Sequence, residues 1–218
     1  MAITTLDMAM IEGTLNGANG AVQLDGSGNL PAVNGSALTG IASNVTLVTS
    51  GAFSAAATVN LTSVLDDTSD HWVLLVTRFT PSTLMDVGFR FSSNGGSTWI
   101  TSGYAYSGTT LQEGYYYPSS QGGTGTSAKI TSDGSSTRMG GGVRTGQIYV
   151  DIWSPGNTGN YPSITWRAQT YNDSGAYPSY THGASVNEAN AAIDSIQIWG
   201  STGTLTGRYA LLKMETSA

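Results

Sequence analysis

The chain has 218 residues and a net charge of −6, and only 10% of its residues are charged, against roughly a quarter in typical globular proteins. It holds 29 glycines and no cysteine, which excludes disulfides, thiolate chemistry and cysteine-ligated zinc. The first Lys or Arg is Arg78 and no basic cluster follows it, so the sequence predicts no nucleic-acid partner.

Residues 1–44 show no regular hydrophobic period and are broken by turn residues such as Asp25 to Gly28. Their later large apolar side chains are few and lie between the turns: Leu24, Leu30, Pro31, Val33, Leu38 and Ile41. A segment of this kind buries too little apolar surface to order itself. We therefore expect an extended N-terminal arm that partner chains or a larger body hold in place.

From Val45 onward the pattern changes to a period of two, which is typical of strands. We expect strands at residues 59–64, 71–79, 87–91, 147–152, 164–169, 193–199 and 205–214. The segment 71–79 is apolar on both faces, so it should lie centrally in a sheet or beside a neighbouring subunit. The Asn94–Gly95 pair predicts a hairpin. These strands, with no convincing long helix, predict an all-β fold: an antiparallel β-sandwich body over residues 45–218 with jelly-roll-like connections.

Between Gly108 and Gly146 the chain is rich in Gly, Ser, Thr and Tyr and shows little alternation, which predicts a long functional or partner-held loop. Five tyrosines lie in or beside this stretch: Tyr104, Tyr106, Tyr115, Tyr116 and Tyr117. A sugar ring stacks its C–H face on an aromatic ring, and tyrosine suits recognition surfaces. Two hypotheses stay open: these rings contact a glycan, or they pack inside an oligomer or against the sandwich.

Other candidate chemistry is sparse. The sequence has no phosphate-binding loop with lysine, no G-x-S-x-G and no H-E-x-x-H, and we interpret His71 and His182 as structural. Asp66, Asp67 and Asp70 form an acidic cluster that we interpret as a solvated turn, with a Ca²⁺ site left open. No strand pattern supplies the carboxylate pair that a glycan-degrading enzyme needs. We expect no catalytic residues and no cofactor.

Three blocks of the sequence resemble a known family. The segment from Ala21 to Ile41 resembles the element VQLDGSGNLPAVDGSQLTGI, found near the start of many bacteriophage tail-fibre and appendage proteins. Residues 72–99 are similar to a phage pattern in which a Y/W-x-L strand precedes P…L-x-x-R-x-S-x-D-G-G-S-T, although Asn94 stands where Asp is common. Residues 193–212 resemble the ending of that pattern. Together the blocks cover about a third of the chain, and they occur in the family's order.

The resemblance implies a structural virion protein, commonly trimeric: a tail or head fibre, or a capsid decoration protein. It implies that the arm of residues 1–44, through its six apolar residues, anchors the chain to other tail or capsid proteins and joins a homotrimer. A carbohydrate-binding module that recognises a host-surface receptor is the alternative function. No secretory signal opens the sequence and no apolar run approaches ~20 residues, so we expect assembly in the host bacterial cytoplasm without membrane insertion.

Overall fold

A computed structural model describes residues 44–112, 115–131, 139–140, 145–171, 178–189 and 191–215. The chain divides into two units, 1–42 and 43–218, and the described residues all belong to the second. The six apolar residues predicted to anchor the arm therefore lie outside the described residues, and their role stays a prediction.

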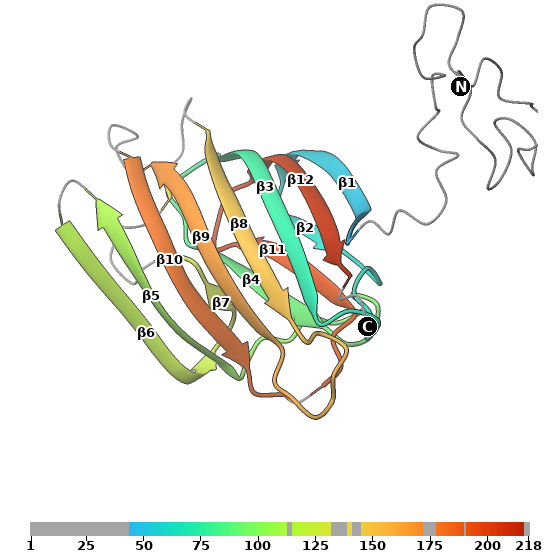
Figure 1. Ribbon diagram of the computed structural model, residues 1–218. Helices are drawn as coiled ribbons and strands as arrows, with labels where there is room; N and C mark the ends of the chain where they lie inside the picture. The colour runs from blue at the N-terminus through green and yellow to red at the C-terminus, as the bar shows by residue number, and fades with distance from the viewer. Residues whose placement is uncertain are drawn as a thin grey trace, which may run out of the picture. The chain divides into compact units, whose positions relative to one another are not determined.

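The described residues form twelve strands, which pair antiparallel throughout (Figure 1). In chain order they are β1 (Val45–Ala56), β2 (Thr58–Leu61), β3 (His71–Pro81), β4 (Val87–Ser92), β5 (Tyr104–Gln112), β6 (Tyr115–Gly125), β7 (Ala128–Lys129), β8 (Gly146–Trp153), β9 (Ser163–Tyr171), β10 (Pro178–Asn187), β11 (Ser195–Gly200) and β12 (Leu205–Met214). Eight strands make one sheet in the order β1-β12-β3-β8-β9-β10-β5-β6. The other four make a second sheet in the order β2-β11-β4-β7.

One hydrophobic core lies between the two sheets. Trp72 of β3 and Val150 of β8 contribute to it from the large sheet, and Phe89 of β4 and Ile198 of β11 contribute from the small one. Along β8 the buried Ile148, Val150 and Ile152 alternate with more exposed residues, as a period of two requires. The predicted all-β, antiparallel fold is confirmed, and the shared core gives it the form of a sandwich.

The doubly apolar segment 71–79 forms most of β3, which lies between β12 and β8. Its central placement is confirmed. Trp72 and Leu74 point into the core, while Val73, on the opposite face of the same strand, is also buried. A strand with neighbours on both sides is the place where apolar residues can be buried on both faces.

The Asn94–Gly95 pair turns the chain, but the hairpin predicted from it is wrong. The N–H of Gly95 donates to the carboxylate of Asp194, 2.9 Å from Oδ2. The chain then contacts β4 through the Ile100 N–H, which donates to the Phe91 carbonyl at 2.8 Å. The next strand, β5, pairs with β10 and β6 in the other sheet. A local turn signal does not specify which strand the chain joins afterwards.

The long loop predicted between residues 108 and 146 is also wrong over its first part, where β5 and β6 form a hairpin. The strand β10 was not predicted from the sequence. Both errors have the same cause, because part of the buried face of these strands is polar. Thr110 and Gln112 of β5 and Ser179 and Thr181 of β10 are buried, and Ser179 Oγ donates to Gln112 Oε1 at 3.1 Å. Strands of this kind show no hydrophobic alternation.

Candidate binding surface

The face of the large sheet that points away from the small sheet is called the outer face here, and it is turned towards the viewer in Figure 1. Strand pairing brings outward side chains from distant parts of the sequence into rows. The first row consists of Gln147, Gln169, Tyr180 and Leu111, from β8, β9, β10 and β5. The second row consists of Tyr149, Arg167 and His182, and the third begins with Asp151 and Thr165.

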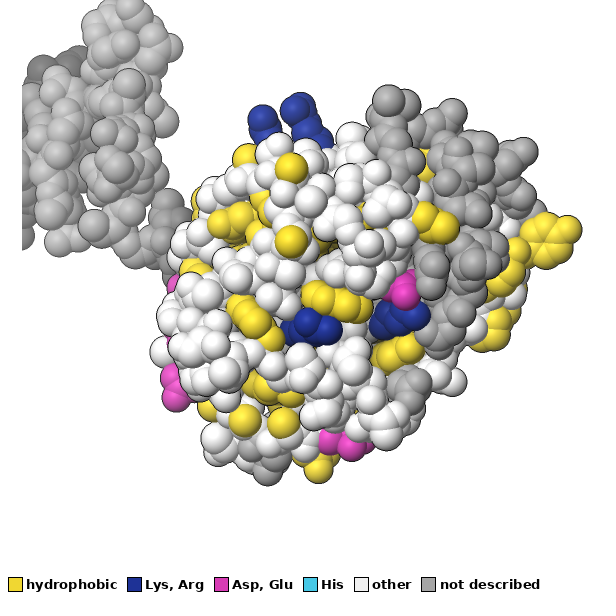
Figure 2. Space-filling model, turned by 180° about the vertical axis from the view of Figure 1, so that it is seen from behind, with side chains coloured by type: hydrophobic (Ala, Val, Ile, Leu, Met, Phe, Trp, Pro, Cys, Tyr) yellow, Lys and Arg dark blue, Asp and Glu magenta, His cyan; other side chains and the backbone are white. Residues whose placement is uncertain are grey.

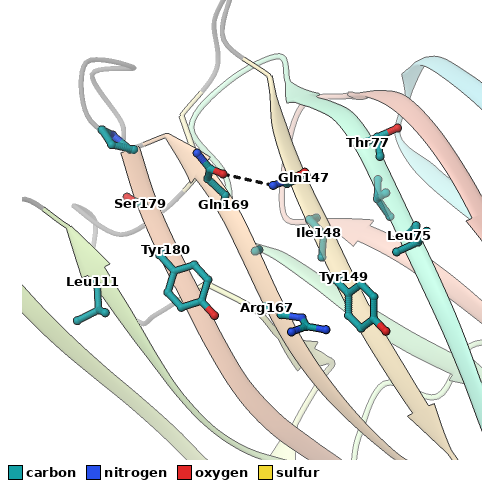
Figure 3. Close-up of a pocket in the computed structure, with 13 residues that line it drawn as sticks. Leu75, Thr77, Leu111, Gln147, Ile148, Tyr149, Arg167, Gln169, Ser179 and Tyr180 are labelled. Atoms are coloured by element: carbon teal, nitrogen blue, oxygen red, sulfur yellow. Dashed lines mark hydrogen bonds between the residues drawn. The ribbon is translucent and has the colours of Figure 1, made fainter.

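Two hollows lie over these rows. The larger has a volume of about 630 Å³, and its lining includes Gln147, Tyr149 and Gln169 (Figure 3). The smaller has a volume of about 360 Å³ and reaches the third row. Arg167 and Tyr180 line both hollows, so the two adjoin. Figure 3 shows Tyr180, Arg167 and Tyr149 projecting from three neighbouring strands.

Several side chains in the larger hollow are held by one another. The guanidinium of Arg167 lies over the ring of Tyr149, with its Cζ 4.2 Å from the ring centroid, in cation–π geometry. Gln147 Nε2 donates to Gln169 Oε1 at 3.3 Å, the bond drawn in Figure 3. These contacts restrict the rotamers of four polar or aromatic side chains before any ligand arrives, which lowers the entropy cost of binding.

The smaller hollow is bordered by a second polar group, centred on Asp151. Its Oδ1 lies 2.8 Å from His71 Nε2, and its Oδ2 accepts from the Thr165 hydroxyl at 3.4 Å. The ring of His71 stacks on Trp153 with centroids 4.0 Å apart and planes 6° from parallel. His71 is thus held by a carboxylate and an indole. The other histidine, His182, has its ring 5.6 Å from that of Tyr180.

The five tyrosines proposed from the sequence as glycan contacts do not form one cluster. Tyr104 is fully buried, and its hydroxyl accepts a hydrogen bond from the Phe91 N–H at 2.8 Å. Tyr106 is 8% exposed. Both rings project from β5 into the core, since two residues along a strand separate side chains on the same face. For Tyr104 and Tyr106 the hypothesis of surface contact is therefore wrong in this chain.

The remaining three tyrosines lie on β6, the last strand of the sheet. Tyr115 and Tyr116 are 65% and 64% exposed, and Tyr117 is partly buried. Tyr116 is paired with Leu111 and so belongs to the outer face, and its hydroxyl accepts from Thr109 Oγ1 at 3.1 Å. Tyr115 and Tyr117 lie on the opposite face, with ring centroids 6.3 Å apart. They present two small surfaces, and glycan contact through them stays a prediction.

The acidic cluster forms a local turn around Asp66. Its carboxylate accepts from the Thr68 N–H at 2.9 Å and the Thr68 hydroxyl at 2.5 Å, and Lys213 Nζ lies 3.6 Å away. Burial alone would raise the pKa of Asp66, but the hydrogen bonds from Thr68 and the charge of Lys213 outweigh it and hold the pKa below its usual value. In the part of the chain that the structure describes, no three His, Cys, Asp or Glu side chains come together in a way that could hold a metal ion.

A separate apolar area lies on β1, the end strand of the large sheet. Leu47 is 57% exposed and Val48 37%, and the strand begins directly after the predicted arm. The pairing of β1 with β12 shifts its register between Leu47 and Thr49, and residues 45–48 are exposed on both faces of the strand. On the face seen in Figure 2, by contrast, hydrophobic side chains are scattered among backbone atoms and side chains that are neither hydrophobic nor charged. In the small sheet, Arg90 lies over the ring of Trp199 at 4.3 Å.

Comparison of the chain with protein-family models, with curated proteins and with solved structures finds no match. Among the described residues, no helix has the length and apolar character that crossing a membrane requires.

Proposed function

We propose that this chain is a structural virion protein of a bacteriophage, without catalytic activity, that works as a homotrimeric fibre or decoration protein of the tail or head. The resemblance of residues 21–41, 72–99 and 193–212 to phage appendage proteins supports the virion assignment. The arm of residues 1–44 anchors the chain to other virion proteins, and the sandwich projects. Assembly then takes place in the cytoplasm of the host bacterium.

The strand order supports a jelly roll as the form of the projecting body. Without the hairpins β5–β6 and β9–β10, the order is β1-β12-β3-β8 in one sheet and β2-β11-β4-β7 in the other. Six of the seven remaining connections cross between the two sheets, and β4 and β7 are neighbours in one sheet. Eight strands distributed in this way form the two Greek keys of a jelly roll.

The main support for a homotrimer is the exposed strand β1, which forms one edge of the large sheet. An edge strand presents unpaired backbone groups, and folded proteins normally protect such strands with charge, proline or a covering segment. The first half of β1 instead exposes Leu47 and Val48 and contains no charged residue. The arm leads directly into this strand, so copies that associate through β1 also bring their arms together. Association would cover the aliphatic side chains and give the arms partners for their backbone groups.

Light scattering on the full chain tests this assembly, and the expected mass is three times 22.5 kDa. The double variant Leu47→Glu, Val48→Glu should dissociate the trimer, because it places charges in the interface. Ser120→Glu, an exposed position on β6 at the far end of the same sheet, is the matched control and should stay trimeric. A wild-type monomer at micromolar concentration would refute the trimer.

Removal of residues 1–44 tests the anchor. The core consists of residues from Phe53 to Leu211, so the shortened chain should keep a cooperative thermal transition. It should no longer attach to phage particles when added during assembly, whereas the full chain should. Attachment of the shortened chain would place the anchor in the sandwich.

A further inference from the structure

The outer face differs from the β1 edge in shape and in chemistry. Around Arg167 the sheet is hollowed rather than flat, and the larger hollow has a volume of about 630 Å³. That value falls in the range of roughly 300–1,000 Å³ that is typical of small-ligand pockets. A concave pocket of this size, formed by five neighbouring strands of one chain, fits a compact ligand better than the surface of a second protein.

The aromatic groups of the hollow can accept the apolar face of a ring. Tyr180 is 43% exposed and stands between Gln169 and Leu111 in the first row. Tyr149 stands in the second row, and the guanidinium of Arg167 lies over its ring. Residues two apart on a strand lie about 7 Å from each other, so a ligand of one or two rings can contact both rows at once. The C–H faces of a pyranose ring are complementary to such phenol surfaces.

The polar groups of the hollow match hydroxyl groups. The bond from Gln147 to Gln169 uses one hydrogen of the first amide and the oxygen of the second. The Gln147 oxygen can then act as an acceptor and the Gln169 NH₂ group as a donor toward a ligand. Adjacent sugar hydroxyls need this combination, because each hydroxyl both donates and accepts. The guanidinium of Arg167 adds several fixed N–H donors.

The charge of the two hollows indicates an uncharged ligand. Among the Lys, Arg, Asp and Glu residues, only Arg167 and Asp151 line the two hollows, so they contribute one positive and one negative charge. An anionic polymer would meet the carboxylate of Asp151 as well as a chain whose net charge is −6. Neutral hydroxyls can instead bond to both charged groups.

From these observations we infer that the outer face binds a neutral saccharide in the hollow centred on Arg167. A pyranose ring stacks on Tyr180, its hydroxyls bond to Gln147 and Gln169, and Arg167 contacts the same or the next unit from its position over Tyr149. The inference goes beyond the proposed virion role and does not depend on the trimer, because a single chain supplies every contact.

The test measures binding of the full chain to neutral hexose and N-acetylhexosamine oligosaccharides of graded length, with sialylated and sulfated oligosaccharides as anionic comparators. An array selects the probe, and calorimetry measures its Kd. Tyr180→Ala and Arg167→Met should each weaken binding at least tenfold, while Tyr180→Phe, which keeps the ring, should stay close to wild type. Both positions are exposed, so thermal melts should show that these variants remain folded.

Tyr115→Ala and Tyr117→Ala are the matched controls, because they remove tyrosines from the opposite face of the same sheet. They should leave Kd unchanged. The inference is overturned if no neutral oligosaccharide binds, if the anionic comparators bind more tightly, or if the control variants lose binding while Tyr180→Ala retains it. Light scattering on the same samples separates the two proposals. If the chain is a trimer but binds no saccharide, saccharide binding in the hollow is refuted and the homotrimer is not. If the chain is a monomer that binds saccharide, the homotrimer is refuted and saccharide binding is not.

Discussion

The hydroxyl of Tyr104 gives a quantitative test of the core. The backbone N–H and carbonyl of Phe91 in β4 both point to the side of the strand on which β7 lies. They find no partner in β7, because β7 pairs only with Gly88 and Phe89. The N–H donates to the Tyr104 hydroxyl at 2.8 Å, and the carbonyl accepts from Ile100. Tyr104 thus takes the place of a missing strand. The change Tyr104→Phe keeps the ring but leaves the Phe91 N–H without its acceptor.

A buried donor that loses its partner costs about 1–3 kcal/mol. For a domain of this size, each 1 kcal/mol lowers Tm by about 2–4 °C, so Tyr104→Phe should lower Tm by about 2–12 °C. The control is Tyr116→Phe, whose hydroxyl accepts from Thr109 in an exposed position and whose loss should cost less than about 0.5 kcal/mol. Differential scanning calorimetry compares the two variants. Equal Tm values for both would refute the role assigned to the Tyr104 hydroxyl.

The dependence of stability on alkaline pH gives a second test of the Tyr104 hydroxyl. Burial raises the pKa of Tyr104 well above its ordinary value near 10, more than the Phe91 N–H and Arg90 lower it. Above pH ~10 the unfolded chain therefore loses this proton while the folded chain keeps it, and stability falls as pH rises. Tyr104→Phe removes this contribution, so the variant's Tm should fall less steeply than that of wild type between pH 9 and 11. Identical slopes would contradict the burial of the hydroxyl.

Two further predictions concern packing and charge. In Gly183→Ala the new methyl group would overlap the ring of Trp166 and the carbonyl oxygen of Ser107, so chemical denaturation should show a free energy of unfolding lower by about 1–3 kcal/mol. The control is Gly122→Ala, where the methyl group meets open space and the free energy of unfolding should not change. Asp66→Asn removes a carboxylate whose pKa is lowered in the folded chain, so its stabilisation is present above pH ~4 and lost as pH falls further. The Tm of Asp66→Asn should therefore lie slightly below that of wild type at pH 7 and equal it at pH 2, and an equal deficit at both pH values would contradict this.

The sequence predicts those parts of the fold where the core is apolar. Over residues 148–152 of β8 and 164–168 of β9 every second residue is a large hydrophobic group or alanine, and the alternation alone identifies the strand and its buried face. Strand β10 and the second half of β5 bury Ser, Thr and Gln instead. A polar side chain is buried at low cost when another supplies its hydrogen bond, as Ser179 does for Gln112. That partner is 67 residues away, and no local pattern identifies it.

The candidate surface as a whole could not be predicted from the sequence, because its residues also come from distant parts of the chain. Density of tyrosines along the chain pointed to residues 104–117, but alternation sends Tyr104 and Tyr106 inward. Tyr149 and Tyr180 are 31 residues apart in the sequence. They become neighbours of Arg167 through the registers of β8 with β9 and of β9 with β10. The alternation in β8 and β9 does indicate which of their residues point outward, and from these positions about half of the surface could have been predicted.

The two proposals are compatible because of their places in the sheet. From β1 to β9 the order is β1-β12-β3-β8-β9, four strand spacings or about 19 Å. A copy docked at the β1 edge therefore need not cover Arg167, and a trimer would present three open hollows. Linked sites bind a repetitive surface far more tightly than one site does, often by a factor of 10²–10⁴. A millimolar Kd for the isolated chain would thus be consistent with firm attachment of a trimer to a polysaccharide. If β1 charge variants that dissociate the trimer kept the wild-type affinity for an immobilised polysaccharide, this account of multivalent attachment would be wrong.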